Sequence, residues 1–391
     1  MTQAINGRAP IAVLVPLSYL SVLIARSYTS LNRLPADPGY GYILDGSELG
    51  LRALALGDPY FHFGARFIAL VVSFFPLESQ AIVLSTAVHL VWSGCAVLIA
   101  AIVTRESRQK WLGFIAGLLL VAVPHASESA LGNVGNVKWP IIAALLVACS
   151  SPASLTRNPV LLASLAVVAG FTQPLTILCV IPPVINALYS RRLSRKQLLF
   201  ISLIIGTLAA QVAKVGISRA TSGQSNKVVS PWEGMGLFWW SGLVGPILIS
   251  LVCCSILLIR QPKIATSLFP FKLALMAGLL SIATYRMGGI ADRYFIAPTA
   301  LALIATFTIQ SQLFAKKPTL RRLGLFISLM ALTIPSTKWF LSGPYLLTPP
   351  PWSVEIARAT QICANDDARS VAVSVSALSS TELECSYILN E

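Results

Sequence analysis

Long apolar runs recur along the whole chain, and they limit its fold more than any other feature of the sequence. Helices that cross the hydrocarbon core of a membrane need about 20 mostly apolar residues, and they bond every backbone group internally. Only 11% of the 391 residues are charged, whereas a soluble domain is roughly a quarter charged. The sequence therefore predicts an all-α polytopic membrane protein. The clearest runs are residues 112–123, 159–170, 197–213, 243–259 and 294–308.

Basic residues gather in short loops between these runs. Cytoplasmic loops of membrane proteins carry an excess of Lys and Arg. The net charge of +14 therefore indicates orientation and contact with anionic membrane lipids, and we expect no nucleic-acid partner. The residues concerned are Arg105, Arg108 and Lys110, then Arg191, Arg192, Arg195 and Lys196, then Arg260 and Lys263, and finally Lys316, Lys317, Arg321 and Arg322.

This charge pattern predicts about eleven spans within a transmembrane domain at 1–341, with the N-terminus cytoplasmic and the C-terminus outside. The run at 10–25 is long for the core of a signal peptide and lacks a small-residue cleavage site, so we expect an uncleaved first helix. The second span is expected at about 79–103 and the last at about 323–341. We expect a multi-pass protein of the bacterial cytoplasmic (inner) membrane.

Residues 27–77 form the longest loop between spans, and they are predicted to lie outside the membrane. Within this first outer loop, residues 62–76 are apolar enough to resemble a span, but counting them would invert every later loop against the charge rule. The segment is short and is closed by Pro76. We therefore expect an interfacial or re-entrant helix there.

The last segment, 342–391, is expected to be a small α+β tail on the outer face. A helix is predicted around 354–363, with strands at 370–375 and 385–389. Cys363 and Cys385 would lie in an oxidising compartment, where they could form one disulfide.

Carboxylates are scarce, and four of them fall in the first outer loop: Asp37, Asp45, Glu48 and Asp58. A carboxylate at the outer membrane surface can act as the general base when an acceptor hydroxyl attacks a sugar carried on a lipid phosphate. We take Asp45 as the first candidate and Glu48 as the second. Asp45 could also be the N-cap of a helix beginning at Gly46 or Ser47, and Glu48 could pair with Arg52.

Cations at the outer ends of helices are candidates for binding the phosphate of such a donor. Arg286 and Arg293 bracket a Gly-rich turn, whose backbone N–H groups also favour anions. His62 and Arg66 of the first outer loop join them as phosphate ligands. Lys138 could instead extend towards the headgroups.

The segment LGNVGNVKWP, residues 131–140, places amides and an aromatic ring at the predicted outer rim. Sugar hydroxyls suit amide side chains and aromatic faces, so we expect Asn133, Asn136 and Trp139 to bind the sugar or its acceptor, together with Tyr294. A plain turn with an interfacial tryptophan is the alternative.

These features together resemble the GT-C superfamily of polyprenyl-phosphate-sugar-dependent membrane glycosyltransferases. The resemblance rests on Phe61-His62 through Arg66, on Gly132, Asn133, Asn136 and Trp139, and on Arg293-Tyr294. It implies a GT-C-like fold and an inverting transfer of sugar from a polyprenyl-phosphate donor to a glycan or lipid acceptor of the cell envelope. The base of such enzymes is an acid of the first outer loop, which falls on Asp45 or next on Glu48. No cofactor is firmly implied, and a divalent metal could take part.

Other classes share the apolar chain with basic cytoplasmic loops. A lipid-linked oligosaccharide flippase should show internal repeats or charges lining a path, and no clear repeat is present. A polysaccharide polymerase is expected to carry its long outer loop late in the chain, whereas this one is early. A non-catalytic membrane scaffold, with the tail binding a partner, is the third alternative.

Overall fold

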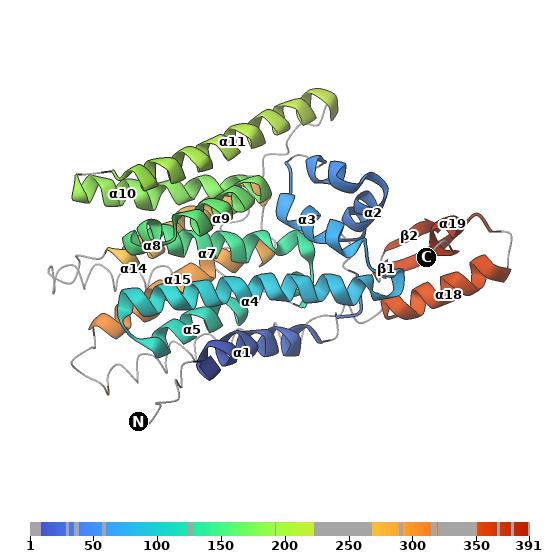
Figure 1. Ribbon diagram of the computed structural model, residues 1–391, viewed down its shortest axis with the longest axis horizontal. Coiled ribbons are helices and arrows are strands. Elements are labelled where there is room, and N and C mark those ends of the chain that lie inside the picture. Colours follow the sequence, from blue (N-terminus) through green and yellow to red (C-terminus); the bar gives the residue numbers. More distant parts are fainter. Residues whose placement is uncertain are drawn as a thin grey trace, which may run out of the picture.

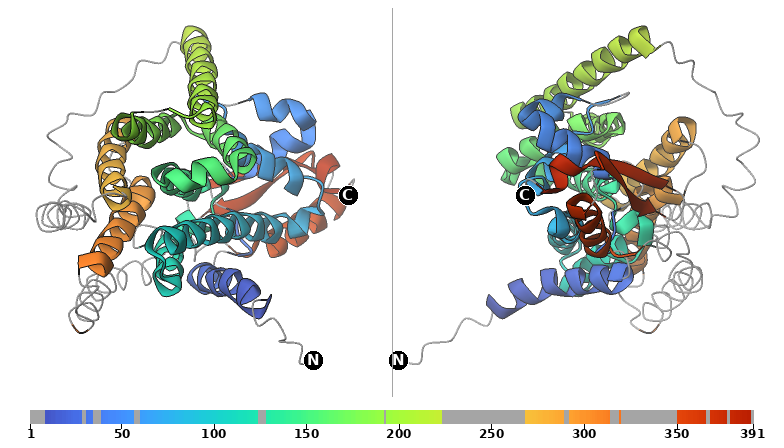
Figure 2. Two further views of the ribbon diagram at one scale, coloured as in Figure 1. Left: turned by 60° about the vertical axis from the view of Figure 1, so that its left-hand side comes forward. Right: turned by 90° about the vertical axis from the view of Figure 1, so that its right-hand side faces the viewer.

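The computed structural model describes residues 9–28, 31–34, 39–56, 60–123, 128–191, 193–222, 268–288, 292–313, 319, 350–365, 368–376 and 379–389. Long helices run side by side through most of this structure, while α2, α3 and the tail gather at one end (Figure 1). The turned views in Figure 2 also place α2 and α3 at the same end as the tail. The mostly helical architecture agrees with the prediction from the sequence.

The helices of the bundle coincide with the apolar runs. Among the described residues, three segments are long and apolar enough to cross a membrane: Leu77–Ser107, Arg195–Val215 and Arg293–Gln312. The spans expected within 233–259 and at 323–341 lie outside the described residues, so the count of eleven stays a prediction. The bundle helices are α1 (Ala9–Ser27), α4 (Gln80–Ser107), α5 (Lys110–Val121), α6 (Glu128–Leu131), α7 (Lys138–Ser150), α8 (Pro152–Arg157), α9 (Pro159–Thr172), α10 (Ile181–Ser190), α11 (Arg195–Ser222), α14 (Phe269–Gly288) and α15 (Ile296–Leu313).

Helix α5 packs closely on α4 through two glycines spaced four residues apart. A Cβ at Gly113 would collide with Thr104, and a Cβ at Gly117 would lie 2.7 Å from the backbone oxygen of Ala96. Small residues at this spacing let membrane helices approach backbone to backbone. Tyr19 of α1 also fills the space beside Gly117 and donates its hydroxyl proton to the Phe114 oxygen at 2.8 Å.

Replacing Gly117 with alanine should therefore destabilise the bundle by about 1–3 kcal/mol, because the added methyl group forces α4 and α5 apart. The thermal unfolding midpoint in detergent measures this loss. Gly94 is the matched control, since a Cβ there meets nothing within 4 Å. Equal midpoints for the two alanine variants would show that the close contact is not needed.

The first outer loop is folded into helices. Its elements are α2 (Gly39–Leu49), the 3-10 turn η2 (Gly50–Ala55), α3 (Phe63–Val72) and the turn η3 (Leu77–Ser79). Helix α3 has ten residues and is about 15 Å long, which is half the thickness of a hydrocarbon core. It is therefore too short to span a membrane, although it is apolar.

Two predictions for α2 are wrong. Asp45 is not an N-cap, because the helix begins six residues earlier and Tyr40, Tyr42 and Ile43 are buried within it. This burial outweighs the low helix propensity of the glycines around them. Glu48 does not pair with Arg52 because Gly50, with a φ of +55°, ends the helix between them.

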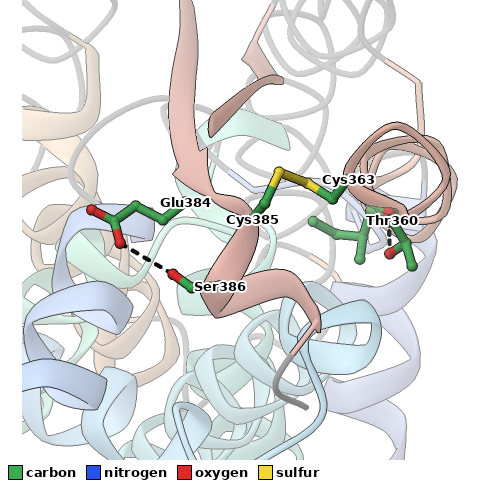
Figure 3. Close-up of a disulfide and its surroundings, with 6 residues drawn as sticks. Thr360, Cys363, Glu384, Cys385 and Ser386 are labelled. Atoms are coloured by element: carbon green, nitrogen blue, oxygen red, sulfur yellow. Dashed lines mark hydrogen bonds between the residues drawn. A yellow bond between two sulfur atoms is a disulfide. The ribbon is translucent and has the colours of Figure 1, made fainter. Parts of the chain in front are cut away.

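The tail consists of α18 (Trp352–Asn365), an antiparallel hairpin of β1 (Ser370–Ser376) and β2 (Ser379–Glu384), and α19 (Cys385–Leu389). The strand predicted at 385–389 is a helix, and the second strand lies just before it. The second strand forms before residue 385 because that segment pairs with β1. In this pairing Thr381 lies opposite Val373 and Leu383 lies opposite Val371. Cys385 then follows the hairpin and forms a disulfide with Cys363, with their Cα atoms 5.3 Å apart (Figure 3).

Candidate functional site

Asp45 and Arg66 form an ion pair between α2 and α3. The Arg66 Nη1 donates to Asp45 Oδ2 at 2.8 Å, and the same nitrogen donates to the Ala53 oxygen at 3.1 Å. The Arg66 side chain is 8% exposed, whereas that of Asp45 is 34% exposed. The buried guanidinium therefore holds one oxygen of a carboxylate that still reaches solvent. Among the residues that the structure describes, Asp45 Oδ1 has no hydrogen-bond partner.

The guanidinium of Arg66 also lies over an aromatic ring. Its central carbon is 4.5 Å from the centroid of Tyr42, a residue of the helix that carries Asp45. A cation in this position is attracted by the face of the ring. Arg66 is thus fixed from three sides, by a carboxylate, a backbone oxygen and an aromatic face.

His62 immediately precedes α3 and has a left-handed backbone, with a φ of 52°. This conformation is unusual for a residue other than glycine, and such strain is often found at functional sites. The imidazole does not cap the helix but stacks on Tyr60, with the ring centroids 3.9 Å apart, and it lies 6.1 Å from Tyr42. The strained turn therefore places the histidine ring close to two tyrosines.

Tyr60 connects this loop with the bundle. The Lys138 Nζ, at the start of α7, donates to the Tyr60 hydroxyl at 3.3 Å. The same ammonium lies 5.4 Å from the Trp139 ring, and Trp139 meets Tyr294 edge to face at 5.6 Å. Burial raises the pKa of Tyr60, and the neighbouring tyrosines raise it further, so the phenol stays protonated.

A second cation stands beside Lys138. The Arg293 guanidinium lies 5.6 Å from the Tyr294 ring, and its charge repels that of Lys138. Within the described part of the chain neither cation has an ion pair with a carboxylate. Two neighbouring cations without a counter-ion favour an anionic ligand.

These contacts join four separate parts of the sequence into one group, which we call the outer-loop cluster. Two hydrogen bonds from backbone N–H groups attach the first-loop residues of this cluster to the bundle. Gly64 N–H donates to Thr172 Oγ1 at 2.8 Å, and Phe61 N–H donates to Gln211 Oε1 at 3.1 Å. The cluster consists of Tyr42, Asp45, Tyr60, His62, Arg66, Lys138, Trp139, Arg293 and Tyr294.

The imidazole of His62 is neutral at physiological pH. Burial is the largest cause that lowers its pKa, and together with the charges of Lys138 and Arg66 it brings the pKa to about 3. His62 can therefore meet a phosphate through a neutral N–H but not as a cation.

This pKa predicts a pH dependence of stability. Between pH about 6.5 and about 3 the unfolded chain binds a proton at His62 and the folded chain does not, so stability falls as the pH drops through this window. His62→Asn should flatten that part of the profile, because asparagine tolerates the left-handed backbone and does not titrate. Unfolding midpoints of both proteins from pH 4 to 7.5 test this. An identical slope for both would contradict it.

The other predicted site residues are Glu48, Asn133, Asn136 and Arg286. Glu48 is exposed, and no ion pair is seen for it within the described residues. Asn133 and Asn136 are 8% and 5% exposed, and Asn133 Oδ1 accepts the Gly135 N–H at 2.8 Å. Their role in sugar binding stays a prediction. Arg286 lies in α14, but its side chain is outside the described residues.

The sequence alone did not assign Tyr60 or Tyr42 to the site, and it left Lys138 open between a functional role and extension towards the headgroups. The signal for Lys138 was its place directly before Trp139, in the turn that was already a candidate. No three His, Cys, Asp or Glu side chains come together as metal ligands among the described residues.

Comparison with protein-family models gives no match, and comparison with curated proteins gives none either. Among solved structures, the chain is similar to the crystal structure of ArnT from Cupriavidus metallidurans bound to undecaprenyl phosphate. This likeness has a TM-score of 0.44 and 15% sequence identity, and it covers 92% of this chain and 80% of that chain.

Proposed function

We propose that this protein transfers a sugar from a polyprenyl-phosphate donor to a hydroxyl of a glycan or lipid acceptor, at the outer face of the bacterial cytoplasmic membrane. One observation carries the proposal: a partly exposed carboxylate, held by a buried arginine, belongs to the same contact network as two cations for which no ion pair is seen among the described residues. A chain of contacts through Arg66, His62 and Tyr60 thereby connects a candidate base with a candidate anion site.

Asp45 is the proposed general base. Its Oδ2 is occupied by Arg66, which leaves Oδ1 to take the proton of an acceptor hydroxyl. The ion pair fixes the direction of the carboxylate, and this saves the entropy of orienting it during the reaction. Glu48 is the weaker candidate because no such partner is seen for it among the residues that the structure describes.

Lys138 and Arg293 are the proposed ligands of the donor phosphate. An ammonium has three donors, and only one of them is directed at the Tyr60 hydroxyl. Arg293 is exposed and can bind a phosphate with two parallel N–H donors. Arg66, expected as a phosphate ligand from the sequence, has its Nη1 committed to Asp45 and Ala53 and is assigned to orienting the base. His62 would add a neutral donor.

Tyr294 is the proposed contact of the sugar or its acceptor, and Trp139, expected from the sequence to be such a contact, is proposed to support the Tyr294 ring from behind. The tryptophan ring is fully buried and meets the partly buried Tyr294 at its edge, beside both phosphate ligands. A sugar attached to a phosphate on Lys138 and Arg293 would lie next to Tyr294. Asn133 and Asn136 are proposed to shape the turn that presents Trp139, with a contact to the sugar still expected from one of their amides.

The reaction is an inverting displacement. The acceptor oxygen bonds to the anomeric carbon as the bond from that carbon to the phosphate oxygen breaks. The hydroxyl proton moves to Asp45 and then to water. The polyprenyl phosphate leaves with the electron pair, and the two cations stabilise its charge without a protein acid.

The experiment is an assay of the purified protein in nanodiscs with a panel of undecaprenyl-phosphate monosaccharides labelled in the sugar. Transfer releases undecaprenyl phosphate and moves the label to an added envelope acceptor. A flippase would move the lipid across a vesicle membrane without breaking the bond to the sugar, and a scaffold would do neither. Lipid movement without any release of undecaprenyl phosphate would overturn the proposal.

A further inference from the structure

Trp352 is the first residue of the tail helix α18, and it is 1% exposed. Its backbone N–H donates to the Asn32 oxygen at 2.7 Å, and its indole Nε1–H donates to the Leu77 oxygen at 2.7 Å. Both acceptors are backbone groups of the first outer loop. One residue of the tail therefore holds two points of a loop that lies about 300 residues away in sequence.

The two acceptors lie at opposite ends of that loop. Asn32 precedes α2, and Leu77 begins η3, after α3 has ended. Between them Trp352 contacts α2 itself, since its ring lies 5.6 Å from that of Tyr40. A side-chain bond from Asn32 Nδ2 to Ser353 Oγ, at 2.8 Å, reinforces the first attachment. Helix α2, which carries Asp45, is thus attached to the tail before its start through Asn32, along its length through Tyr40, and after α3 through Leu77.

Helix α18 is itself braced within the tail. Glu355 is 5% exposed and receives the Arg358 Nη2 at 2.9 Å and the Ser374 N–H of β1 at 3.1 Å. Burial alone would raise the pKa of Glu355, but these hydrogen bonds hold the pKa below its usual value. The Glu355 carboxylate therefore stays ionised. The disulfide joins the end of α18 to α19 (Figure 3). These contacts therefore fix the position of Trp352 within the tail.

We infer that the tail is a clamp on the first outer loop, and that Trp352 is a positioning residue for the ion pair of Asp45 and Arg66. Lys138 and Arg293 belong to the bundle, and no contact of Trp352 with them is seen in the described residues. The clamp therefore fixes the position of Asp45 and does not contact Lys138 or Arg293 among the described residues. Its effect on rate rests on the proposed function, whereas its effect on the loop does not.

The decisive variant is Trp352→Phe in the full-length protein in nanodiscs. It keeps an aromatic ring against Tyr40 and removes the bond to Leu77. Hydrogen exchange of the backbone amides of α2 and α3 should become about tenfold faster, as expected for the loss of one buried hydrogen bond. Exchange in α4 and α7 should be unchanged, which separates a loosened loop from a misfolded protein.

Val354→Ala is the matched control, because Val354 lies on the same helix with its side chain 54% exposed. It should leave exchange in α2 unchanged. If Trp352→Phe fails to fold, Ser353→Ala removes only the side-chain bond to Asn32 and should give a smaller change in the same direction. Unchanged exchange in α2 and α3 in the folded Trp352 variant would overturn the clamp.

Kinetics then separate the clamp from the proposed function. Trp352→Phe should lower kcat several-fold while the Kd for undecaprenyl phosphate stays within about twofold, because the two charged phosphate ligands, Lys138 and Arg293, are untouched. A raised Kd with an unchanged kcat would contradict the positioning role. If the wild-type protein transfers no sugar but exchange still rises in the variant, the proposed function fails and the clamp stands.

Discussion

Replacing Asp45 with asparagine is expected to slow sugar transfer by about 10²–10⁴-fold, the usual contribution of a positioned general base. The amide keeps the size of the side chain and a contact to Arg66, but it cannot accept the acceptor's proton. The binding of undecaprenyl phosphate should change little, because Lys138 and Arg293 are intact. Single-turnover transfer in nanodiscs measures the rate, and the unfolding midpoint verifies that the variant is folded.

Two carboxylates of the same loop region complete this test. Glu78 is exposed in η3 and outside the outer-loop cluster, so Glu78→Gln should retain the wild-type rate. Glu48→Gln examines the second candidate base and should retain most of the activity. A normal rate for Asp45→Asn together with a large loss for Glu48→Gln would move the base to Glu48.

Replacing Lys138 with methionine is expected to reduce kcat/KM by about 10–100-fold, since a charge-assisted hydrogen bond contributes about 1.5–3 kcal/mol. Methionine keeps the apolar stem and removes the ammonium that contacts the Tyr60 hydroxyl and stands next to Arg293. Most of the loss should be weaker binding of undecaprenyl phosphate. Titration of nanodisc-bound protein with this lipid, followed by the fluorescence of the tryptophans, measures it.

Lys110→Met is the matched control for charge. Lys110 is exposed at the start of α5, and its loop is predicted to be cytoplasmic. Its loss lowers the net charge equally, so any general effect on anionic lipids appears in both variants. Equal weakening by the two substitutions would mean that Lys138 has no specific role at the phosphate.

The sequence predicted many helices of the bundle, because such helices depend on local apolar runs. The runs at 159–170 and 294–308 coincide with α9 and α15. It also predicted that α3 is a short helix of the first outer loop. Helix α2 was harder, since glycines and tyrosines around Asp45 favour other conformations locally, and only packing against distant residues makes that segment helical.

The candidate site was only partly visible for the same reason. Asp45 and Arg66 were both singled out, but their pairing across 21 residues depends on how α2 folds back on α3. The bond between Tyr60 and Lys138 spans 78 residues, and no local pattern could predict it. The hydrogen bond between Trp352 and Leu77 joins residues that are farther apart still in the sequence. Sequence motifs identified candidate residues, whereas contacts between distant parts of the chain determined which roles they can play.

The location of a bound lipid phosphate tests the central claim most directly. A structure of the full-length protein in nanodiscs with undecaprenyl phosphate should place the phosphate within hydrogen-bonding distance of Lys138 and Arg293, with Asp45 facing the space beside it. At the opposite end of the bundle, a cavity of about 310 Å³ is lined by Glu106, Asn186 and Gln197. Phosphate density in that cavity, with none at Lys138, would contradict the proposed site.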